Sequence, residues 1–273
     1  MSVVAKVAFV GYERSVAAAL DAIGAGDRLP AEGLILIKPN LTNADPPPVT
    51  TPVEAAEAVY LYCRAHCGAE VAIAEGCGSG VTADAFAANG YTAMAARHGL
   101  RLIDFNTAPA VTVRRDDALQ LKQFHLPEIA RDAFLISLPI LKDHSFTGTT
   151  IAMKNMFGLA PAPFYRGSWN KSKLHSPSTD RSVFDVCLYK RPDLCVVDAV
   201  TALTGMHLAG TPRRLGTILA GFDPVAVDAV GSEMLGHDPP ALEYLALANG
   251  VLGDMDDIEI RTGEGVDPGG GNW

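Results

Sequence analysis

The stretch KDHSFTGTTIAMKNMFGL, residues 142–159, concentrates side chains that could bind an anion or move protons. It follows the apolar run DAFLISLPIL, residues 132–141, which predicts a buried strand. Lys142 and Lys154 lie within dense apolar sequence, and a partly buried lysine needs an anion or hydrogen-bond partners. It can hold a carboxylate or phosphate, or act as a base with a lowered pKa. His144 could be a general acid or base, so we expect Lys142, His144 and Lys154 to be catalytic.

Two more side chains of this stretch, Thr149 and Asn155, are predicted to bind the substrate. Asp143 lies beside His144 in the sequence. In an extended segment its side chain points to the opposite face, so it need not be the partner of the histidine.

Polar side chains also end other apolar runs. GLILIKPN ends in Lys38 and Asn40, AEVAIAEG carries Glu75, and DLCVVDAV carries Asp198. Ligands of open α/β sheets bind beyond the carboxyl ends of the strands, so these groups should gather near Lys142. We expect Lys38, Asn40 and Asp198 to bind substrate and Glu75 to be catalytic, with the two carboxylates neutralising the lysines. KPN could also be a simple turn.

Residues 160–180, APAPFYRGSWNKSKLHSPSTD, lack apolar periodicity and interleave basic with aromatic residues. A long segment without elements of its own is usually a functional loop. We expect it to form a lid that brings Arg166 and His175 over the bound anion.

The sequence EGCGSG places Gly76, Gly78 and Gly80 between an expected strand and an expected helix, with Asp104 at the end of the next strand. The dinucleotide fingerprint is G-x-G-x-x-G, and this turn is one residue short. A nicotinamide or flavin site is therefore an alternative interpretation. The turn could instead let a substrate approach backbone N–H groups.

Alternating strands and helices predict an α/β fold with a mainly parallel sheet flanked by helices on both faces. Strands should begin near residues 33, 69, 100, 133, 193 and 215, with a small β excursion over residues 110–127. A helix is expected over 51–68, with Thr51 as N-cap, Pro52 at the first position, Glu54 completing a capping box, and Gly68 closing it. We expect one domain over residues 1–265 and a frayed tail over 266–273.

Two aspartates belong to a second expected helix. Asp223 precedes Pro224 and should cap the helix, and Asp228 on that helix could reach inward.

Five motifs in order, LILIKPNLT, TTP, LPILKDH, TTIAMKNMFGL and AGFDPVAVDAVG, resemble the DUF362 family over most of the chain, from about Gly33 to Gly250. The resemblance implies that Lys142-Asp143-His144 stands where the family usually has Lys-Thr-His. Many relatives attach a ferredoxin-like module with iron–sulfur cysteines, which this chain lacks. We therefore do not infer from the resemblance that this chain transfers electrons through iron–sulfur clusters.

The composition of the chain excludes some classes of binding partner. Lys+Arg 22 against Asp+Glu 31 gives a net charge of −9, which disfavours nucleic acid and anionic membranes and leaves a small anionic molecule. No signal peptide or apolar run of ~18 residues is seen, so a cytoplasmic protein is expected, and a homo-oligomer is left open. The spacing of the cysteines cannot supply four cluster ligands, so no iron–sulfur cluster is expected. A divalent metal ion is compatible with the carboxylates and histidines but not required.

These residue types favour an enzyme that acts on a small anionic metabolite by proton transfer, of the isomerisation or elimination type, without a cofactor or with metal assistance. Two alternatives stay open. One is an oxidoreductase that binds a nucleotide cofactor at the GCGSG turn. The other is a non-catalytic protein that binds a ligand or metal.

Overall fold

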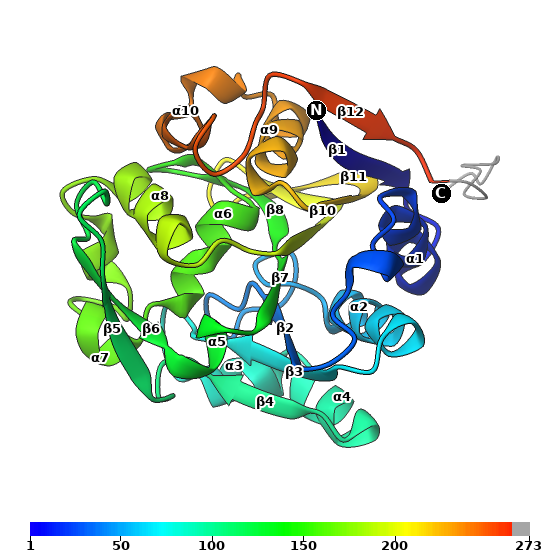
Figure 1. Ribbon diagram of the computed structural model, residues 1–273, viewed down its shortest axis with the longest axis horizontal. Helices are drawn as coiled ribbons and strands as arrows, with labels where there is room; N and C mark the ends of the chain where they lie inside the picture. Colours follow the sequence, from blue (N-terminus) through cyan, green and yellow to red (C-terminus); the bar gives the residue numbers. More distant parts are fainter. Residues whose placement is uncertain (264–273) are drawn as a thin grey trace.

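The computed structural model describes residues 1–263, and most of its strands form one ten-stranded sheet (Figure 1). These strands are β1 (Ser2–Ala8), β2 (Leu34–Pro39), β3 (Glu70–Glu75), β4 (Arg101–Asp104), β7 (Phe134–Leu138), β8 (Ile140–His144), β9 (Gly148–Thr150), β10 (Leu194–Thr204), β11 (Thr211–Gly221) and β12 (Ile258–Arg261). The expected excursion is a separate antiparallel pair, β5 (Ala110–Arg114) and β6 (Gln123–Pro127). The expected tail and residues 264 and 265 lie outside the described residues.

The helices lie between these strands. They are α1 (Tyr12–Ala22), η1 (Gly26–Arg28), α2 (Val53–His66), α3 (Thr82–Ala88), α4 (Tyr91–His98), α5 (Glu128–Arg131), α6 (Ala152–Asn155), η2 (Met156–Leu159), α7 (Ala162–Tyr165), η3 (Ser172–His175), α8 (Thr179–Tyr189), α9 (Pro224–Leu235), η4 (Pro239–Ala241) and α10 (Glu243–Ala248), where η marks a 3₁₀ helix. None of those between residues 1 and 263 is both long enough and apolar enough to span a membrane.

The centre of the sheet is doubly wound. The strand order is β12-β1-β11-β10-β7-β2-β3-β4, and the segment from β10 to β4 is parallel throughout. The chain runs outward from β2 through β3 to β4, and then returns to β7 on the other side of β2. The strand order therefore reverses between β2 and β7, which is the position where open α/β sheets bind ligands.

Side chains of the central strands alternate between two cores, as the period of two requires. Ile35 and Ile37 pack in a core with residues of α1, α2 and α4, whereas Leu36 packs in a second core with residues of α6 and α8. Helices thus cover both faces of the sheet (Figure 1). The predicted fold class, a mainly parallel sheet between helices, is confirmed.

The strand expected near residue 215 is an exception to the parallel order of the sheet. It begins at Thr211 and runs antiparallel to both β10 and β1. A parallel strand would need a crossover of a dozen or more residues after β10, whereas the short connection 205–210 can only form a hairpin. The expectation of a mainly parallel sheet allows this one antiparallel strand among the six expected strands.

The start of α2 also differs. The helix begins at Val53, its N-cap is Pro52 without a side-chain cap, and the C-cap is Cys67 rather than Gly68. The hydroxyl of Thr51 instead accepts from Asn40 N and donates to Leu138 O, both at 2.9 Å. Because these two backbone groups sit at adjacent strand ends, the hydroxyl serves them rather than the helix.

The two aspartates of α9 behave as expected. Asp223 caps the helix by accepting hydrogen bonds from Val225 N and Ala226 N. The buried Asp228 reaches inward, and its carboxylate accepts from Ala152 N and Met153 N in the first turn of α6. Helix α9 therefore fixes the position of α6, which carries two predicted site residues.

Candidate functional site

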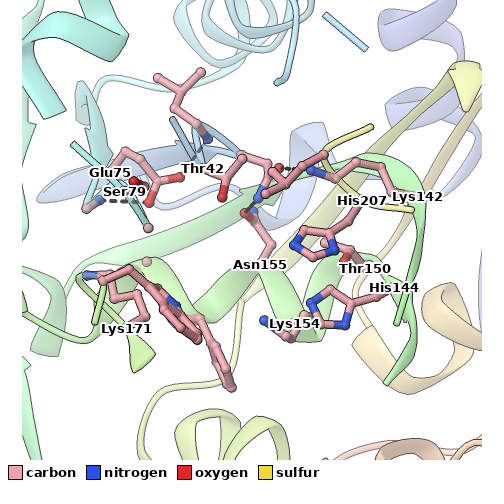
Figure 2. Close-up of a pocket in the computed structure, with 18 of the residues that line it drawn as sticks. Thr42, Glu75, Ser79, Lys142, His144, Thr150, Lys154, Asn155, Lys171 and His207 are labelled. Atoms are coloured by element: carbon pink, nitrogen blue, oxygen red, sulfur yellow. Dashed lines mark hydrogen bonds between the residues drawn. The ribbon is translucent and has the colours of Figure 1, made fainter. Parts of the chain in front are cut away.

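A cavity of about 420 Å³ lies at the carboxyl ends of β2, β3 and β8, beside the β2–β7 switch point (Figure 2). This volume is in the usual range for small-molecule sites. The predicted site residues that line it are Lys38, Asn40, Glu75, Lys142, His144, Lys154, Asn155 and His175.

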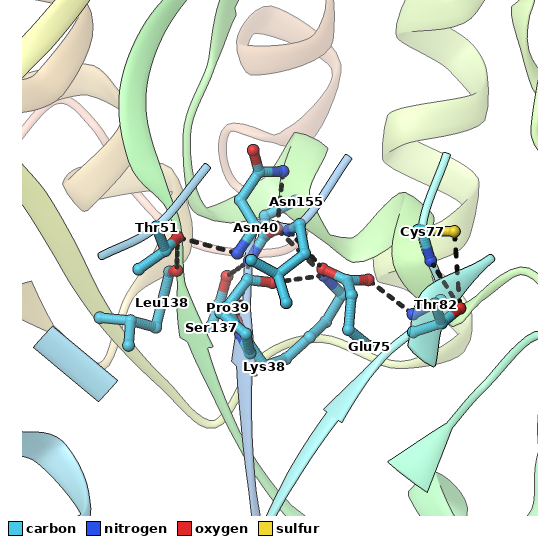
Figure 3. Close-up of polar contacts among 12 residues, drawn as sticks. Lys38, Pro39, Asn40, Thr51, Glu75, Cys77, Thr82, Ser137, Leu138 and Asn155 are labelled. Atoms are coloured by element: carbon cyan, nitrogen blue, oxygen red, sulfur yellow. Dashed lines mark hydrogen bonds and ion pairs between the residues drawn. The ribbon is translucent and has the colours of Figure 1, made fainter. Parts of the chain in front are cut away.

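The floor of the cavity is a hydrogen-bonded ion pair (Figure 3). Lys38 is fully buried, and its Nζ donates to Glu75 Oε2 at 2.8 Å, Asn155 Oδ1 at 3.0 Å and Pro39 O at 3.1 Å. Burial lowers the pKa of Lys38, and the nearby Glu75 carboxylate opposes that shift. All three donors of the ammonium group are therefore used within the protein.

Both oxygens of the Glu75 carboxylate accept hydrogen bonds within the protein. Its Oε1 accepts from Gly76 N at 2.7 Å, and its Oε2 accepts from Leu41 N at 3.1 Å as well as from Lys38. A β-carbon at Gly158 would overlap both Glu75 Oε1 and Lys38 Cε, so the backbone closes tightly over the pair. In this arrangement both oxygens of Glu75 hold parts of the protein, namely Lys38 and two strand ends.

Asn155 joins the two strands of the switch point. Its Nδ2 donates to Lys38 O on β2 at 3.1 Å and to Ser137 Oγ on β7 at 3.0 Å. Its Oδ1 accepts from Asn40 Nδ2 at 3.2 Å. Asn40 in turn accepts from Lys142 Nζ through its own Oδ1 at 2.7 Å.

Lys142 and His144 face the cavity from β8, while Asp143 points away, as predicted for an extended segment. Asp143 instead contacts His237 Nε2 at 2.8 Å. Lys142 Nζ donates to Asn40 Oδ1 and to Val49 O, and it has no carboxylate partner among residues 1–263. Burial is the main cause that lowers the pKa of Lys142 to about 7.

Lys154 approaches from α6 and is the least bonded lysine of the cavity. Its Nζ lies 3.8 Å from the centre of the Phe157 ring, and no acceptor among residues 1–263 lies within hydrogen-bond distance of it. Burial and then the charge of Lys142 lower its pKa to about 7, while Asp180 opposes the shift.

Lys171 is a site residue that sequence analysis missed. Its Nζ donates to Asn106 Oδ1 and to Ala160 O, and burial lowers its pKa to about 7. The mixture of basic and aromatic residues in 160–180 was the available signal, but it did not single out one cation. Arg166, which was chosen, donates to Asn170 Oδ1 and does not line the cavity.

The histidines present two different ring nitrogens. His144 Nδ1 accepts from Phe146 N at 3.1 Å, so the neutral ring carries its proton on Nε2. His175 Nδ1 donates to Lys171 O at 3.1 Å, which leaves a lone pair on Nε2. Burial lowers the pKa of both rings, to about 4 for His175.

Aromatic and imidazole rings form the outer wall of the cavity. Phe157 and Trp169 each pack edge-on against His175, with centroids 5.5 Å apart. His207, also missed from the sequence, stacks on His144 at 4.2 Å. It lies in the hairpin loop between β10 and β11, and no motif or periodic pattern indicated that this loop would reach the site. Segment 160–180 lines the cavity through Trp169 and Lys171, which lie in the turn before η3, and through His175 of η3. It also contains the short helix α7, so it is less irregular than expected.

Two other predicted residues lie elsewhere. Thr149 Oγ1 bonds to Tyr244 OH at 2.8 Å, because the alternation of β9 turns the neighbouring Thr150 toward the cavity instead. Asp198 accepts from Tyr12 OH at 2.8 Å on the α1 side of the sheet, so it does not neutralise the lysines. Burial raises the pKa of Asp198 to about 6.

The glycine turn is largely occupied by protein contacts. Gly76 N donates to Glu75 Oε1, Cys77 N to Thr82 Oγ1 and Ser79 N to Thr42 O, so three N–H groups of the turn are already bonded within the protein. Asp104 accepts from Thr82 Oγ1 and Asn106 N. Within residues 1–263 no three His, Cys, Asp or Glu side chains are arranged to hold a metal ion.

The fold and the cavity define a doubly wound α/β protein with a lysine-rich pocket at its switch point. The chain belongs to the family described as "Domain of unknown function (DUF362)", whose pattern matches residues 35–233. It is also similar to the Thylakoid-associated protein sll1697 of Synechocystis sp., at 26% identity over 235 residues, which is 82% of this chain and 69% of that protein. No solved structure matches the chain.

Proposed function

We propose that this protein is a cytoplasmic enzyme that binds a small anionic metabolite in the cavity and catalyses a proton transfer, of the isomerisation or elimination type. The observation that carries the proposal is a surplus of buried cations. Lys38, Lys142, Lys154 and Lys171 face the single carboxylate of Glu75, which gives 4 − 1 = +3 when all are ionised.

Such a cluster is costly without a counterion. Two like charges ~4 Å apart repel by about 4 kcal/mol at an effective dielectric constant of ~20. Glu75 already accepts from Lys38 and two backbone N–H groups, and within residues 1–263 the other three lysines have no carboxylate in hydrogen-bond contact. An anionic ligand would relieve this repulsion and raise the lowered pKa values of the three amines.

The imidazoles supply the proton-transfer part of the proposal. At neutral pH His175 offers a lone pair on Nε2, which can accept a proton, and His144 offers an N–H group, which can donate a hydrogen bond. The ammonium form of Lys142, with a pKa of about 7, can return a proton. Their ring centroids are 6.3 Å apart, so one small ligand can contact both. Lys142 and Lys171 would hold its anionic group.

Calorimetric titration with phosphate, dicarboxylates and oxo acids tests the binding step. Lys142→Met and Lys171→Met should lower the affinity for the anion that binds by at least about tenfold while the far-UV circular dichroism stays unchanged. Lys173→Met is the matched control, because Lys173 lies in the same segment but is exposed. Equal affinity for wild type and both site variants would contradict the proposal.

Proton exchange distinguishes the proposed enzyme from the non-catalytic alternative, which would bind the ligand without reacting with it. An enzyme of this type should exchange a C–H proton of its bound ligand with D₂O, as followed by NMR, and His175→Gln should slow that exchange much more than it weakens binding. Binding without any exchange would favour a carrier. The nucleotide-dependent alternative loses support because the glycine turn and Asp104 are already engaged.

A further inference from the structure

The amine of Lys154 differs from the other three of the cavity. Lys38, Lys142 and Lys171 each donate to at least two oxygen atoms of the protein, which hold the amine in place and favour its protonated form. Lys154 Nζ has no such acceptor among the described residues and contacts only the face of the Phe157 ring. It is both buried and free to form a new bond.

The charges around Lys154 come from several elements. Cations approach it from β2 and β8 through Lys38 and Lys142, and Asp180 at the start of α8 is the opposing anion. Imidazoles that face it are His144 on β8, His175 on η3 and His207 in the β10–β11 loop. Phe157 favours the ammonium form through its ring face. Burial and the like charges outweigh that contact, so a substantial fraction of the amine is neutral near pH 7.

We propose that Lys154 is a covalent nucleophile that forms a Schiff base with a small oxo acid, whose carboxylate is held by the neighbouring lysines. This inference rests on the proposed function and names its substrate class. A desolvated lysine next to another cation is the usual setting for an amine that attacks a carbonyl carbon.

The chemistry balances with groups already present. The neutral amine attacks the carbonyl carbon, a C–N bond forms as the C–O π bond breaks, and a proton passes from the nitrogen to the oxygen to give a carbinolamine. A second proton lets that oxygen leave as water, and the product is a protonated imine. The ammonium form of Lys142, whose charge acts on Lys154, can deliver this second proton, while His144 Nε2–H can donate a hydrogen bond to the oxygen. The imine withdraws electrons from the adjacent C–H bond, whose proton His175 Nε2 can accept, and reversal of the steps with water releases the product.

Reductive trapping tests the inference on the intact chain. The purified protein is incubated with pyruvate or 4-oxopentanoate and sodium cyanoborohydride, and is then analysed by intact mass and peptide mapping. The expected result is one adduct, with the mass of the probe acid less one oxygen atom, on Lys154. An adduct only on Lys142, Lys171 or surface lysines would overturn the assignment.

Variants separate this inference from the proposed function. Lys154→Arg keeps the positive charge but cannot form an imine, so it should lose the adduct and retain anion binding within a few-fold. Lys173→Met should keep the adduct. If wild type binds the oxo acid but gives no adduct, the Schiff base is wrong while the anion site stands. If no anion binds at all, both fail. Peptide mapping of the wild-type protein shows whether Lys154 carries the adduct even if Lys154→Arg does not fold.

Discussion

At the scale of single residues, some polar side chains of the cavity have hydrogen-bond partners within the protein and others do not. Lys38, Glu75 and Asn155 use their hydrogen-bonding atoms internally. Thr150 Oγ1 and His207 Nδ1, by contrast, are buried without a partner in the part of the chain that the structure describes, and both residues line the cavity. Buried polar groups are rarely left unpaired, so these two atoms point to a polar ligand.

The adjacent threonines Thr149 and Thr150 give a direct test. Thr150→Val should leave the free energy of unfolding unchanged or slightly higher, because an unpaired buried hydroxyl is replaced by a group of the same shape. Thr149→Val should lower it by about 1–2 kcal/mol, because the bond to Tyr244 is lost. Urea denaturation measures both. If Thr150→Val is as destabilising as Thr149→Val, the hydroxyl of Thr150 has a partner within the protein.

The ion pair beneath the cavity should be sensitive to loss of either charge. Glu75→Gln leaves Lys38 buried without a counterion, and we expect the free energy of unfolding to fall by about 3–5 kcal/mol. Glu70→Gln at the other end of β3 is the control, since its pair with Arg101 is exposed and should change stability by less than about 1 kcal/mol. Similar small losses for both variants would mean that Lys38 is already neutral.

At the scale of elements, the switch point is held by side chains that cross between β2 and β7. Asn155 bonds to Lys38 O and Ser137 Oγ, and Thr51 bonds to Asn40 N and Leu138 O. Parallel strands that diverge after their last ladder bond leave such backbone groups unpaired unless side chains serve them. These links also set the position of Asn40, which holds Lys142.

Thr51→Val should therefore act on both the fold and the site. It leaves Asn40 N and Leu138 O without their partner, and we expect a loss of about 1–3 kcal/mol in the free energy of unfolding together with weaker anion binding. Thr107→Val, which removes an exposed hydroxyl beside Asp104, should be neutral within about 0.5 kcal/mol. Unfolding curves and titrations of the two variants decide whether the link is needed.

The same elements show which site residues could be predicted from the sequence. Residues at strand ends, such as Lys38 and Lys142, could be predicted because the sheet itself delivers them to one edge. Thr149 was chosen over Thr150 because a short strand such as β9 carries too little pattern to fix which face is buried.

Residues from loops could not be predicted in the same way. Lys171 and His207 reach the cavity through η3's preceding turn and through a hairpin, and neither path follows from a periodic pattern. Asp198 shows the opposite error. It occurs on a strand that continues beyond it to Thr204, so it lies mid-strand, with its side chain on the α1 side of the sheet.

At the scale of the whole molecule, an acidic chain of net charge −9 encloses a cationic cavity. The overall electrostatic field of a negatively charged protein does not attract anions, so the affinity of the proposed site must come from short-range contacts inside the cavity. These contacts depend on the protonation of amines that burial has made weakly basic, and this couples ligand binding and folding to pH in opposite directions.

Between pH about 7.5 and 9 the free protein should become more stable as pH rises. The unfolded chain keeps its lysines protonated, with pKa about 10.4, whereas Lys142, Lys154 and Lys171 have a pKa of about 7 when folded. Because the unfolded state then binds more protons, the free energy of unfolding increases by up to about 1.4 kcal/mol per pH unit for each amine. Anion affinity should fall over the same range, because the site loses its protons.

Urea midpoints and titrations at several pH values test this pair of trends. Lys154→Met should reduce the pH slope of stability, and Lys173→Met should not. The window stays below about pH 9 because burial raises the pKa of Cys63 to about 12, which reverses the sign once unfolded thiols ionise. A flat stability profile would show that the buried amines keep ordinary pKa values.

The edge-on packing of Trp169 against His175 gives the site a built-in optical reporter. The chain has two tryptophans, and the other, Trp273, lies outside the described residues. In a Trp273→Phe variant, all indole emission would come from the wall of the cavity. Entry of a ligand changes the water and the charge around that indole, so its emission should shift with occupancy. Stopped-flow fluorescence could then follow binding to a substrate that carries no chromophore, before its reaction is known.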